Sequence, residues 1–404
     1  MAEILASPRR APLDHPLDIR VTGLAPDTEV TVRVSTGDHE SEAVFRSDER
    51  GVVDLTRHAP LKGGYRTVDP MGLFWSMTPC PGEPHPTRIE AGDATPVEVE
   101  RLRVPDHVTR TELDTLSAVL FEPAPTTTTT PRPAVIVLGG SEGGRHEVDA
   151  ALLAGHGFTT LALAYFGARN VPDDLVHLPV EHVGDALAFL TARAGSGKVG
   201  IVGGSRGGEL ALLAAATYPE VAAVVSVVGS GVMTQCIGPG GRLLQKLDHE
   251  AASWTWKGRP LPYLPYYVPE ELRRQVVEGE PVTLAAAFDL SDGIPETAEI
   301  PVERIAGGVL LLSSGRDGSW PSAALSEVAE RRLTAHRHPF RHEHVVYPEA
   351  GHLIAGPPHR PAAHTVLPGP GVRFDHGGTP AATAAARTDA WSRTIEFLSD
   401  QLGT

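Results

Sequence analysis

Residues 203–207 carry the pattern most suggestive of chemistry, a serine in the glycine-rich turn Gly-Gly-Ser-Arg-Gly. The turn follows the apolar stretch 199–202 and opens a helical stretch at Arg206, so G-x-S-x-G stands between a strand and a helix. Such a nucleophile elbow holds a serine on a strained backbone that requires small neighbours. A glycine-rich turn with a bystander serine is the alternative, and the flanking elements favour Ser205 as a nucleophile.

A serine hydroxyl is a weak nucleophile at neutral pH and needs a neighbouring base. In chains with this elbow, an acid and then a histidine follow the serine. Asp317 comes soon after the apolar stretch 309–312, and His352 follows the strand-like stretch 345–347. We therefore expect Asp317 to orient His352, and His352 to take the proton of Ser205.

Other side chains compete for these two supporting roles. The competing histidines are His342, His344 and His359. The first two precede or lie on the strand that leads to His352, and the third follows two prolines farther along the chain. Glu343 and Glu349 are too close to His352 in sequence to orient it, and Asp317 could instead cap the helix that follows it.

Acyl chemistry on a serine also needs two backbone N–H donors for the developing oxyanion. One donor is expected from Arg206, directly after the nucleophile. The other is expected from the loop 139–144, Gly-Gly-Ser-Glu-Gly-Gly, through Ser141 or Glu142. A phosphate-binding loop is the alternative, but the loop lacks the G-x-x-x-x-G-K-[ST] pattern, and no ribose-binding acid follows it at the right distance.

The composition excludes several other classes of function. Thirty-five basic and 50 acidic residues give a formal net charge of −15, which argues against binding to nucleic acid or to an anionic membrane. Two cysteines, Cys80 and Cys236, cannot form a cysteine-rich zinc site, and the helical H-E-x-x-H motif is absent. We expect no metal and no cofactor. Without a signal-like or membrane-spanning apolar run, a soluble cytoplasmic protein is expected.

Two different patterns of apolar and polar residues divide the 404 residues into two regions. Residues 1–100 alternate apolar and polar positions between turns, which predicts a small β-sandwich. Residues 101–404 alternate uninterrupted apolar strands with helical stretches, which predicts a doubly wound α/β sheet. The threonine run 126–130 is expected to be a surface turn within the second domain, because 116–122 already resembles a strand of that sheet.

An aromatic-rich interval at about 230–300 interrupts the strand–helix alternation. An insertion of this size between two core strands is where an α/β enzyme would carry a lid. We expect its aromatic side chains to contact substrate, with ordinary insertion core as an equal alternative. The candidate contacts are Trp254, Trp256 and Tyr263.

With these motifs in order, the chain resembles the acyl-CoA thioesterase and bile acid-CoA:amino acid N-acyltransferase family along nearly its whole length. The segments that carry the resemblance are Pro70–Met77, Ala151–Phe158, Leu161–Phe166, Gly203–Leu210, Ile300–Arg304, Trp320–Ser322 and Tyr347–Ile354. The resemblance implies an immunoglobulin-like β-sandwich followed by an α/β-hydrolase domain. It also implies a triad of nucleophile, Asp and His that falls on Ser205, Asp317 and His352.

The resemblance implies an enzyme that acts on a small acyl thioester, with acyl-CoA as the expected substrate. Members that transfer the acyl group to an amino acid resemble one another in using cysteine, so Ser205 favours hydrolysis. Acyl transfer, ester or lactone hydrolysis, and a non-catalytic binding protein are the alternatives. Arg206 stands where animal members commonly have lysine, the acid turn is shorter, and the interval 230–300 matches poorly. Arg145 and Arg169 are candidates for contacts with the CoA group.

Overall fold

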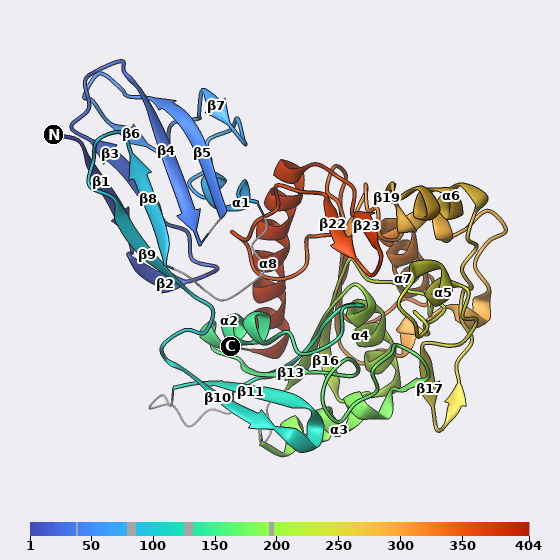
Figure 1. The fold of residues 1–404 in the computed structure, drawn as a ribbon. Helices are drawn as coiled ribbons and strands as arrows, with labels where there is room; N and C mark the ends of the chain where they lie inside the picture. The colour runs from blue at the N-terminus through green and yellow to red at the C-terminus, as the bar shows by residue number, and fades with distance from the viewer. Residues whose placement is uncertain (38, 79–85, 125–131, 194–197, 404) are drawn as a thin grey trace.

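The computed structural model describes residues 1–37, 39–78, 86–124, 132–193 and 198–403. An N-terminal β-sandwich precedes a larger α/β unit, and the long helix α8 (Pro380–Leu402) runs beside the junction between them (Figure 1). The threonine run 126–130, expected to be a surface turn, lies outside the described residues.

Alternating side chains build the sandwich, which confirms the fold predicted for this region. On β4, Val30, Val32 and Val34 are buried while Glu29 and Arg33 are exposed, as expected for a strand with one face toward a core. One sheet contains β1 (Glu3–Ser7), β3 (Asp18–Thr22) and β6 (Val53–Asp54). The other contains β2 (Arg10–Pro12), β9 (Val97–Leu102), β8 (Thr87–Ala91), β4 (Glu29–Thr36), β5 (His39–Arg46) and β7 (Lys62–Gly63), in that order.

An eight-stranded sheet forms the centre of the α/β unit. Its order is β10 (Val108–Leu113), β11 (Ala118–Pro123), β13 (Thr159–Leu163), β12 (Ala134–Leu138), β15 (Val199–Gly204), β16 (Val221–Val227), β20 (Gly308–Ser314) and β21 (His342–Tyr347). Strand β11 runs antiparallel to both neighbours, and the pairings from β13 to β21 are parallel. All residues of β12 and β13 are buried, because helices cover both faces of a parallel sheet.

Helices on the two faces enclose separate apolar cores. One core lies under α2 (Glu147–Gly155) and α8, and the other under α3 (Glu181–Arg193), α4 (Arg206–Thr217) and α7 (Ser322–Ala335). Helix α8 is capped at both ends. The side chain of Thr379 accepts a hydrogen bond from the N–H of Ala382 at the N-terminus, and Gly403, with a φ of 79°, is the C-terminal cap. Among the helices of the described residues, none combines the length and apolar composition that a bilayer crossing requires.

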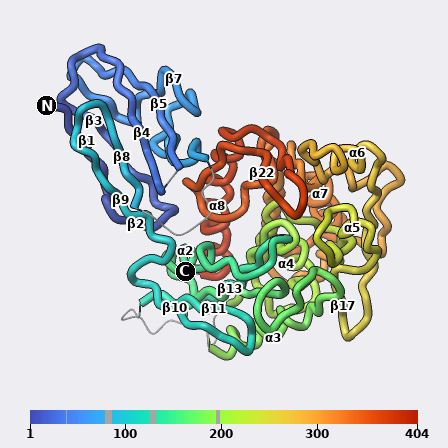
Figure 2. The backbone as a smooth tube through the Cα atoms, in the orientation of Figure 1, coloured from blue at the N-terminus to red at the C-terminus, as the bar shows by residue number. Residues whose placement is uncertain are grey.

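Short helices and strands complete the described chain. They are α1 (Gly72–Trp75), α5 (Leu243–Leu247), α6 (Glu270–Glu278), β14 (Leu178–Pro179), β17 (Trp254–Trp256), β18 (Arg259–Pro260), β19 (Pro281–Val282), β22 (Val366–Gly369), β23 (Val372–Asp375) and 3-10 turns at 114–116, 284–287, 296–298 and 302–304. Strand β19 pairs with β23, so the end of the insertion joins the segment before α8 (Figure 2). The end of the predicted insertion therefore packs against the segment that leads into α8.

The two units share buried contacts. The carboxylate of Asp14 accepts a hydrogen bond from Trp391 Nε1 at 3.0 Å. The same carboxylate lies 2.7 Å from His156 Nε2. The apolar core of the sandwich also includes Ala362 and Ala384 from the α/β unit. The sandwich therefore packs against the α/β unit through this junction.

Candidate active site

The predicted elbow is a sharp turn between β15 and α4. Ser205 has φ 53° and ψ −121°, a backbone conformation that residues other than glycine rarely adopt. The turn is closed so tightly that a Cβ on Gly203 would lie 2.0 Å from the carbonyl oxygen of Gly207. The N–H of Ser205 donates to the carbonyl of Val227 at 2.9 Å. Glycine at both flanking positions is therefore a steric requirement of the turn.

The three residues expected to act together lie in hydrogen-bond contact. His352 Nε2 is 3.0 Å from Ser205 Oγ, and His352 Nδ1 is 2.8 Å from Asp317 Oδ2. The side chain of Asp317 is 1% exposed and that of His352 is 11% exposed. A buried carboxylate, a partly accessible imidazole and a hydroxyl in this order can pass a proton from the hydroxyl to the ring.

Backbone groups hold Asp317 and His352 in place. The second carboxylate oxygen of Asp317 accepts hydrogen bonds from the N–H groups of Ser319 at 2.9 Å and Trp320 at 3.3 Å. The N–H of His352 donates to the carbonyl of His376 at 2.8 Å. The rings of Trp320 and His376 flank the imidazole, with centroids at 6.5 and 6.1 Å. His376 had no signal in the sequence, because it lies on a loop far along the chain.

The glycine-rich loop after β12 lies directly against Ser205. A Cβ on Gly140 would come within 3.2 Å of Ser205 Cβ, and one on Gly207 would lie 2.3 Å from the carbonyl oxygen of Gly139. The hydroxyl of Tyr165 donates to that same carbonyl at 2.8 Å and so anchors the loop. The N–H groups of this loop and of Arg206 remain the predicted oxyanion donors, and Ser141 and Glu142 line the cavity beside Ser205.

A charged cluster fixes the start of α2 behind this loop. His146 Nε2 is 2.8 Å from Glu142 Oε1, and His146 Nδ1 is 3.5 Å from Asp149 Oδ2. Burial alone would lower the pKa of His146, but the hydrogen bonds and charges of Asp149 and Glu142 outweigh it and raise the pKa to about 10. His146 is therefore a cation at neutral pH, and it compensates the carboxylates of Glu142 and Asp149.

This raised pKa predicts a pH-dependent stability difference between the wild type and His146→Gln. The contribution of His146 is fully present below its ordinary pKa of 6.5 and is lost as the pH rises through about 10. The wild type should therefore have the higher unfolding free energy. The difference between the two proteins should be largest at about pH 6 and should shrink as the pH rises toward about 10. Urea denaturation across this range measures the difference. His249→Gln, at an exposed position, is the control, and a difference that does not change with pH would contradict the assignment.

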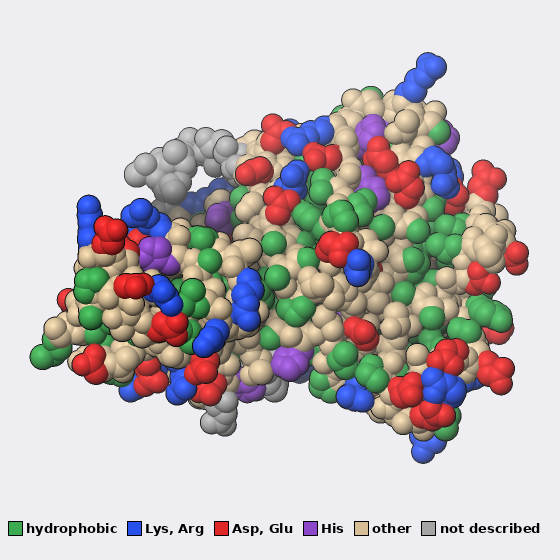
Figure 3. Space-filling model, turned by 90° about the horizontal axis from the view of Figure 1, so that it is seen from above, with side chains coloured by type: hydrophobic (Ala, Val, Ile, Leu, Met, Phe, Trp, Pro, Cys, Tyr) green, Lys and Arg blue, Asp and Glu red, His purple; other side chains and the backbone are tan. Residues whose placement is uncertain are grey.

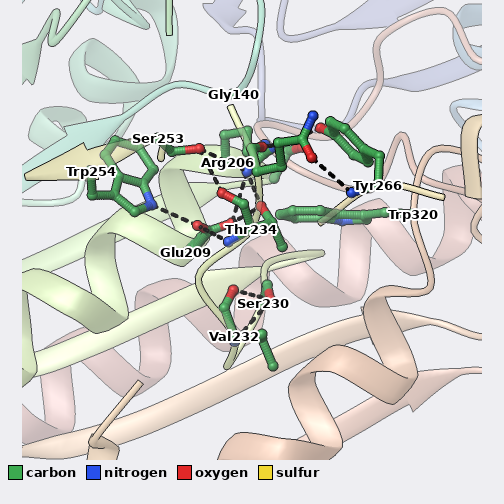
Figure 4. A network of polar contacts seen from close by, with 12 residues as sticks. Gly140, Arg206, Glu209, Ser230, Val232, Thr234, Ser253, Trp254, Tyr266 and Trp320 are labelled. Atoms are coloured by element: carbon green, nitrogen blue, oxygen red, sulfur yellow. Dashed lines mark hydrogen bonds and ion pairs between the residues drawn. The ribbon is translucent and has the colours of Figure 1, made fainter. Parts of the chain in front are cut away.

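Arg206 has a second role that its position in the motif did not reveal. Its side chain is buried, with nitrogens 3.2 Å from Glu209 Oε2, 2.6 Å from the carbonyl of Gln235 and 2.5 Å from the hydroxyl of Tyr266. The guanidinium also lies over the ring of Trp320 at 5.4 Å (Figure 4). Arg206 therefore connects the elbow to the insertion and to the turn that carries Asp317.

Glu209 completes this network one helical turn later. It is fully buried, and its carboxylate accepts hydrogen bonds from Trp254 Nε1 at 2.6 Å and from the N–H and hydroxyl of Thr234 at 2.9 and 2.7 Å. Figure 4 shows these groups converging on one carboxylate beneath the elbow. The carboxylate satisfies both the buried Arg206 and the backbone of the insertion.

A cavity of about 980 Å³ contains Ser205 and His352 in its wall. The three aromatic side chains predicted to contact substrate are not among the described residues that line it. Trp254 is 1% exposed and held by Glu209, Trp256 packs edge-on against Tyr218, and Tyr263 lies outside the lining. Three other aromatic side chains line the cavity instead. Tyr266 and Phe288 come from the insertion, and Trp320 comes from the turn after Asp317.

The histidines and the glutamate that competed with His352 and Asp317 in the sequence make other contacts. His344 is bound to Ser313 at 2.7 Å, His342 is 3.5 Å from Glu330, and Glu349 pairs with Arg316 at 3.0 Å. His359 lines the cavity, but its neighbours are the arginines of the domain junction. Within the described residues, no group of three or more His, Cys, Asp or Glu side chains is placed to hold a metal ion.

Two family models match this chain. Residues 178–404 match the family model described as BAAT/acyl-CoA thioester hydrolase C terminal, and residues 14–118 match the acyl-CoA thioester hydrolase/BAAT N-terminal region. The chain belongs to the acyl-CoA thioester hydrolase/BAAT family. Its predicted resemblance and its α/β-hydrolase fold with an N-terminal sandwich are thereby confirmed.

Relatives of known name match over almost the whole chain. Human acyl-coenzyme A thioesterase 1 is 30% identical, over 99% of this chain and 96% of its own length. Human mitochondrial acyl-coenzyme A thioesterase 2 is also 30% identical, over 99% of this chain and 84% of its own length. A dienelactone hydrolase structure from Anabaena variabilis aligns with 73% of this chain and 99% of its own, at 18% identity and a TM-score of 0.40.

Proposed function

We propose that the protein is a serine hydrolase that cleaves acyl thioesters, with acyl-CoA as the substrate. The observation that carries this proposal is the contact series from Asp317 through His352 to Ser205 beside a large cavity. The family's thioesterases supply the substrate class. The serine nucleophile favours water over an amino acid as the final acceptor of the acyl group.

The geometry supports a two-step reaction. Ser205 Oγ attacks the thioester carbonyl carbon while His352 Nε2 takes the hydroxyl proton, and Asp317 stabilises the resulting imidazolium. Collapse of the tetrahedral intermediate breaks the C–S bond, and the proton on His352 passes to the departing thiolate. An ester between the acyl group and Ser205 remains.

Water completes the cycle by the same groups. His352 removes a proton from a water molecule that attacks the acyl ester, and it then returns that proton to Ser205 as the free acid leaves. In both steps the carbonyl oxygen becomes an anion. The N–H of Arg206 and an N–H of the 139–144 loop are proposed to stabilise it.

The acyl-enzyme can be trapped and located. After rapid mixing with acyl-CoAs of varied chain length and an acid quench, peptide mass spectrometry should find the acyl mass on the peptide that contains Ser205. Free thiol and free acid should appear in equal amounts in the steady state. An adduct on another residue, or no thiol from any substrate, would refute the proposal. With glycine present as an acceptor, conjugates formed faster than free acid would replace hydrolysis with transfer.

A further inference from the structure

The cavity beside Ser205 has two chemically different ends. One end is apolar and is formed largely by the insertion and by β23, with Ile237, Leu243, Leu247, Leu284, Phe288 and Phe374 in its wall. The other end lies at the junction with the β-sandwich and is rich in basic side chains, namely Arg101, Arg103, His359, Arg360, His364 and Arg387. In Figure 1, the sandwich lies at the upper left and the insertion at the right, with α8, β22 and β23 between them.

The basic end is assembled from three distant parts of the chain. Arg101 stands on β9 of the sandwich and Arg103 on the connection that follows it, Arg360 on the loop after His352, and Arg387 on α8. Arg387 donates to the carbonyls of Leu353 and Arg360, so it fixes the loop that carries Arg360. Seen from above, basic and histidine side chains lie where the two units meet (Figure 3).

Two observations indicate that this end has capacity for an anion. The Nε of Arg101 is buried and has no hydrogen-bond partner among the described residues, although its terminal nitrogens are held by the carbonyls of Leu13 and His15. Arg360 is 48% exposed and only loosely paired, at 3.9 Å from Asp149.

Among the described residues, two carboxylates at this junction have other partners. Asp14 is bound to His156 and Trp391, and Asp149 lies against His146. By contrast, the arginine considered from sequence as a CoA contact, Arg145, is paired with Glu112 at 2.9 Å and Glu147 at 3.3 Å, and neither Arg145 nor Arg169 is in the described lining of the cavity.

We propose that the basic end of the cavity binds the phosphorylated nucleotide portion of coenzyme A through Arg101, Arg103 and Arg360, while the acyl chain occupies the apolar end. This inference rests on the proposed thioesterase function. Guanidinium groups match phosphate oxygens with paired, charge-assisted hydrogen bonds. With one end of the substrate held by charge and the other by apolar contact, the thioester between them lies at Ser205.

A pair of matched substrates tests the site. Acyl-CoA carries the nucleotide, whereas the acyl thioester of N-acetylcysteamine has the same reactive group without it. For Arg103→Gln combined with Arg360→Gln, we expect KM for acyl-CoA to rise at least about 10-fold, from two lost charged hydrogen bonds. The kcat/KM for the N-acetylcysteamine thioester should stay within about twofold of wild type. Arg50→Gln, at an exposed turn of the same sandwich, is the control.

Equal losses on both substrates would mean a structural role for these arginines and would overturn the proposal, as would an unchanged KM for acyl-CoA. A second measurement does not depend on turnover. Adenosine 3′,5′-bisphosphate should bind the wild type in calorimetry, and the double variant should bind it at least about 10-fold more weakly. If the wild type hydrolysed neither thioester, the thioesterase proposal would fail, and the bisphosphate titration would still decide whether this end is a nucleotide phosphate site.

Discussion

Ser205→Ala is expected to lower kcat for acyl-CoA hydrolysis by a factor on the order of 10⁵. The substitution removes the atom that would form the acyl ester, while His352 and Asp317 keep their hydrogen bond at 2.8 Å. Residual turnover would come from substrate binding and the oxyanion donors, which stabilise attack by water alone. Release of free thiol, followed with a chromogenic disulfide, measures the loss.

Two controls make this result specific to the hydroxyl. The melting temperature of Ser205→Ala should remain close to that of the wild type, because Ser205 Oγ contacts His352 at the cavity wall and supports no packing. Ser291→Ala, at an exposed turn of the insertion, should keep full activity. If Ser205→Ala retained more than about a tenth of wild-type kcat with its fold intact, nucleophilic catalysis by Ser205 would be excluded.

Glu209→Ala is expected to reduce the free energy of unfolding by about 3–5 kcal/mol. The substitution leaves the guanidinium of Arg206 buried without its carboxylate, and it also deprives Trp254 Nε1 and the N–H of Thr234 of their acceptor. An uncompensated buried charge costs far more than an exposed ion pair contributes. Urea denaturation monitored by tryptophan fluorescence measures the change.

A matched double variant separates charge from packing. Arg206→Met combined with Glu209→Leu removes both charges and keeps much of the side-chain volume, so it should be more stable than Glu209→Ala alone. Glu278→Ala, on the exposed face of α6, should change stability by less than about 0.5 kcal/mol. A Glu209→Ala variant with wild-type stability would mean that the network beneath the elbow does not hold Arg206.

The sequence was sufficient for the elbow because its determinants are local. The spacing of Gly203 and Gly207 around Ser205 encodes a sterically tight turn, and apolar runs without polar interruption encode buried parallel strands. The proximity of Asp317 and His352 to Ser205 could also be expected, since each lies in the loop after a core strand, and the carboxyl ends of parallel strands lie along one edge of a sheet.

The remainder of the site depends on contacts that no short segment encodes. Trp254 was expected at the substrate, but a buried carboxylate 45 positions earlier in the chain binds its indole N–H. An amphipathic aromatic ring fits an apolar pocket and a hydrogen-bonded core equally well, so composition cannot separate the two. The basic end of the cavity was missed for a similar reason, because its arginines come from β9, the connection after it, the loop after His352 and α8.

The side chain of Arg206 has a consequence for engineering of this enzyme family. One residue supplies a backbone N–H beside the nucleophile, and its guanidinium simultaneously binds the insertion through the carbonyl of Gln235 and the hydroxyl of Tyr266. The insertion is therefore not an exchangeable module. A chimera that takes the insertion of a relative, but keeps Arg206 and Glu209, would have a mismatched contact between the insertion and the turn that carries Ser205. Substrate range in this scaffold should change together with the residue that follows the nucleophile.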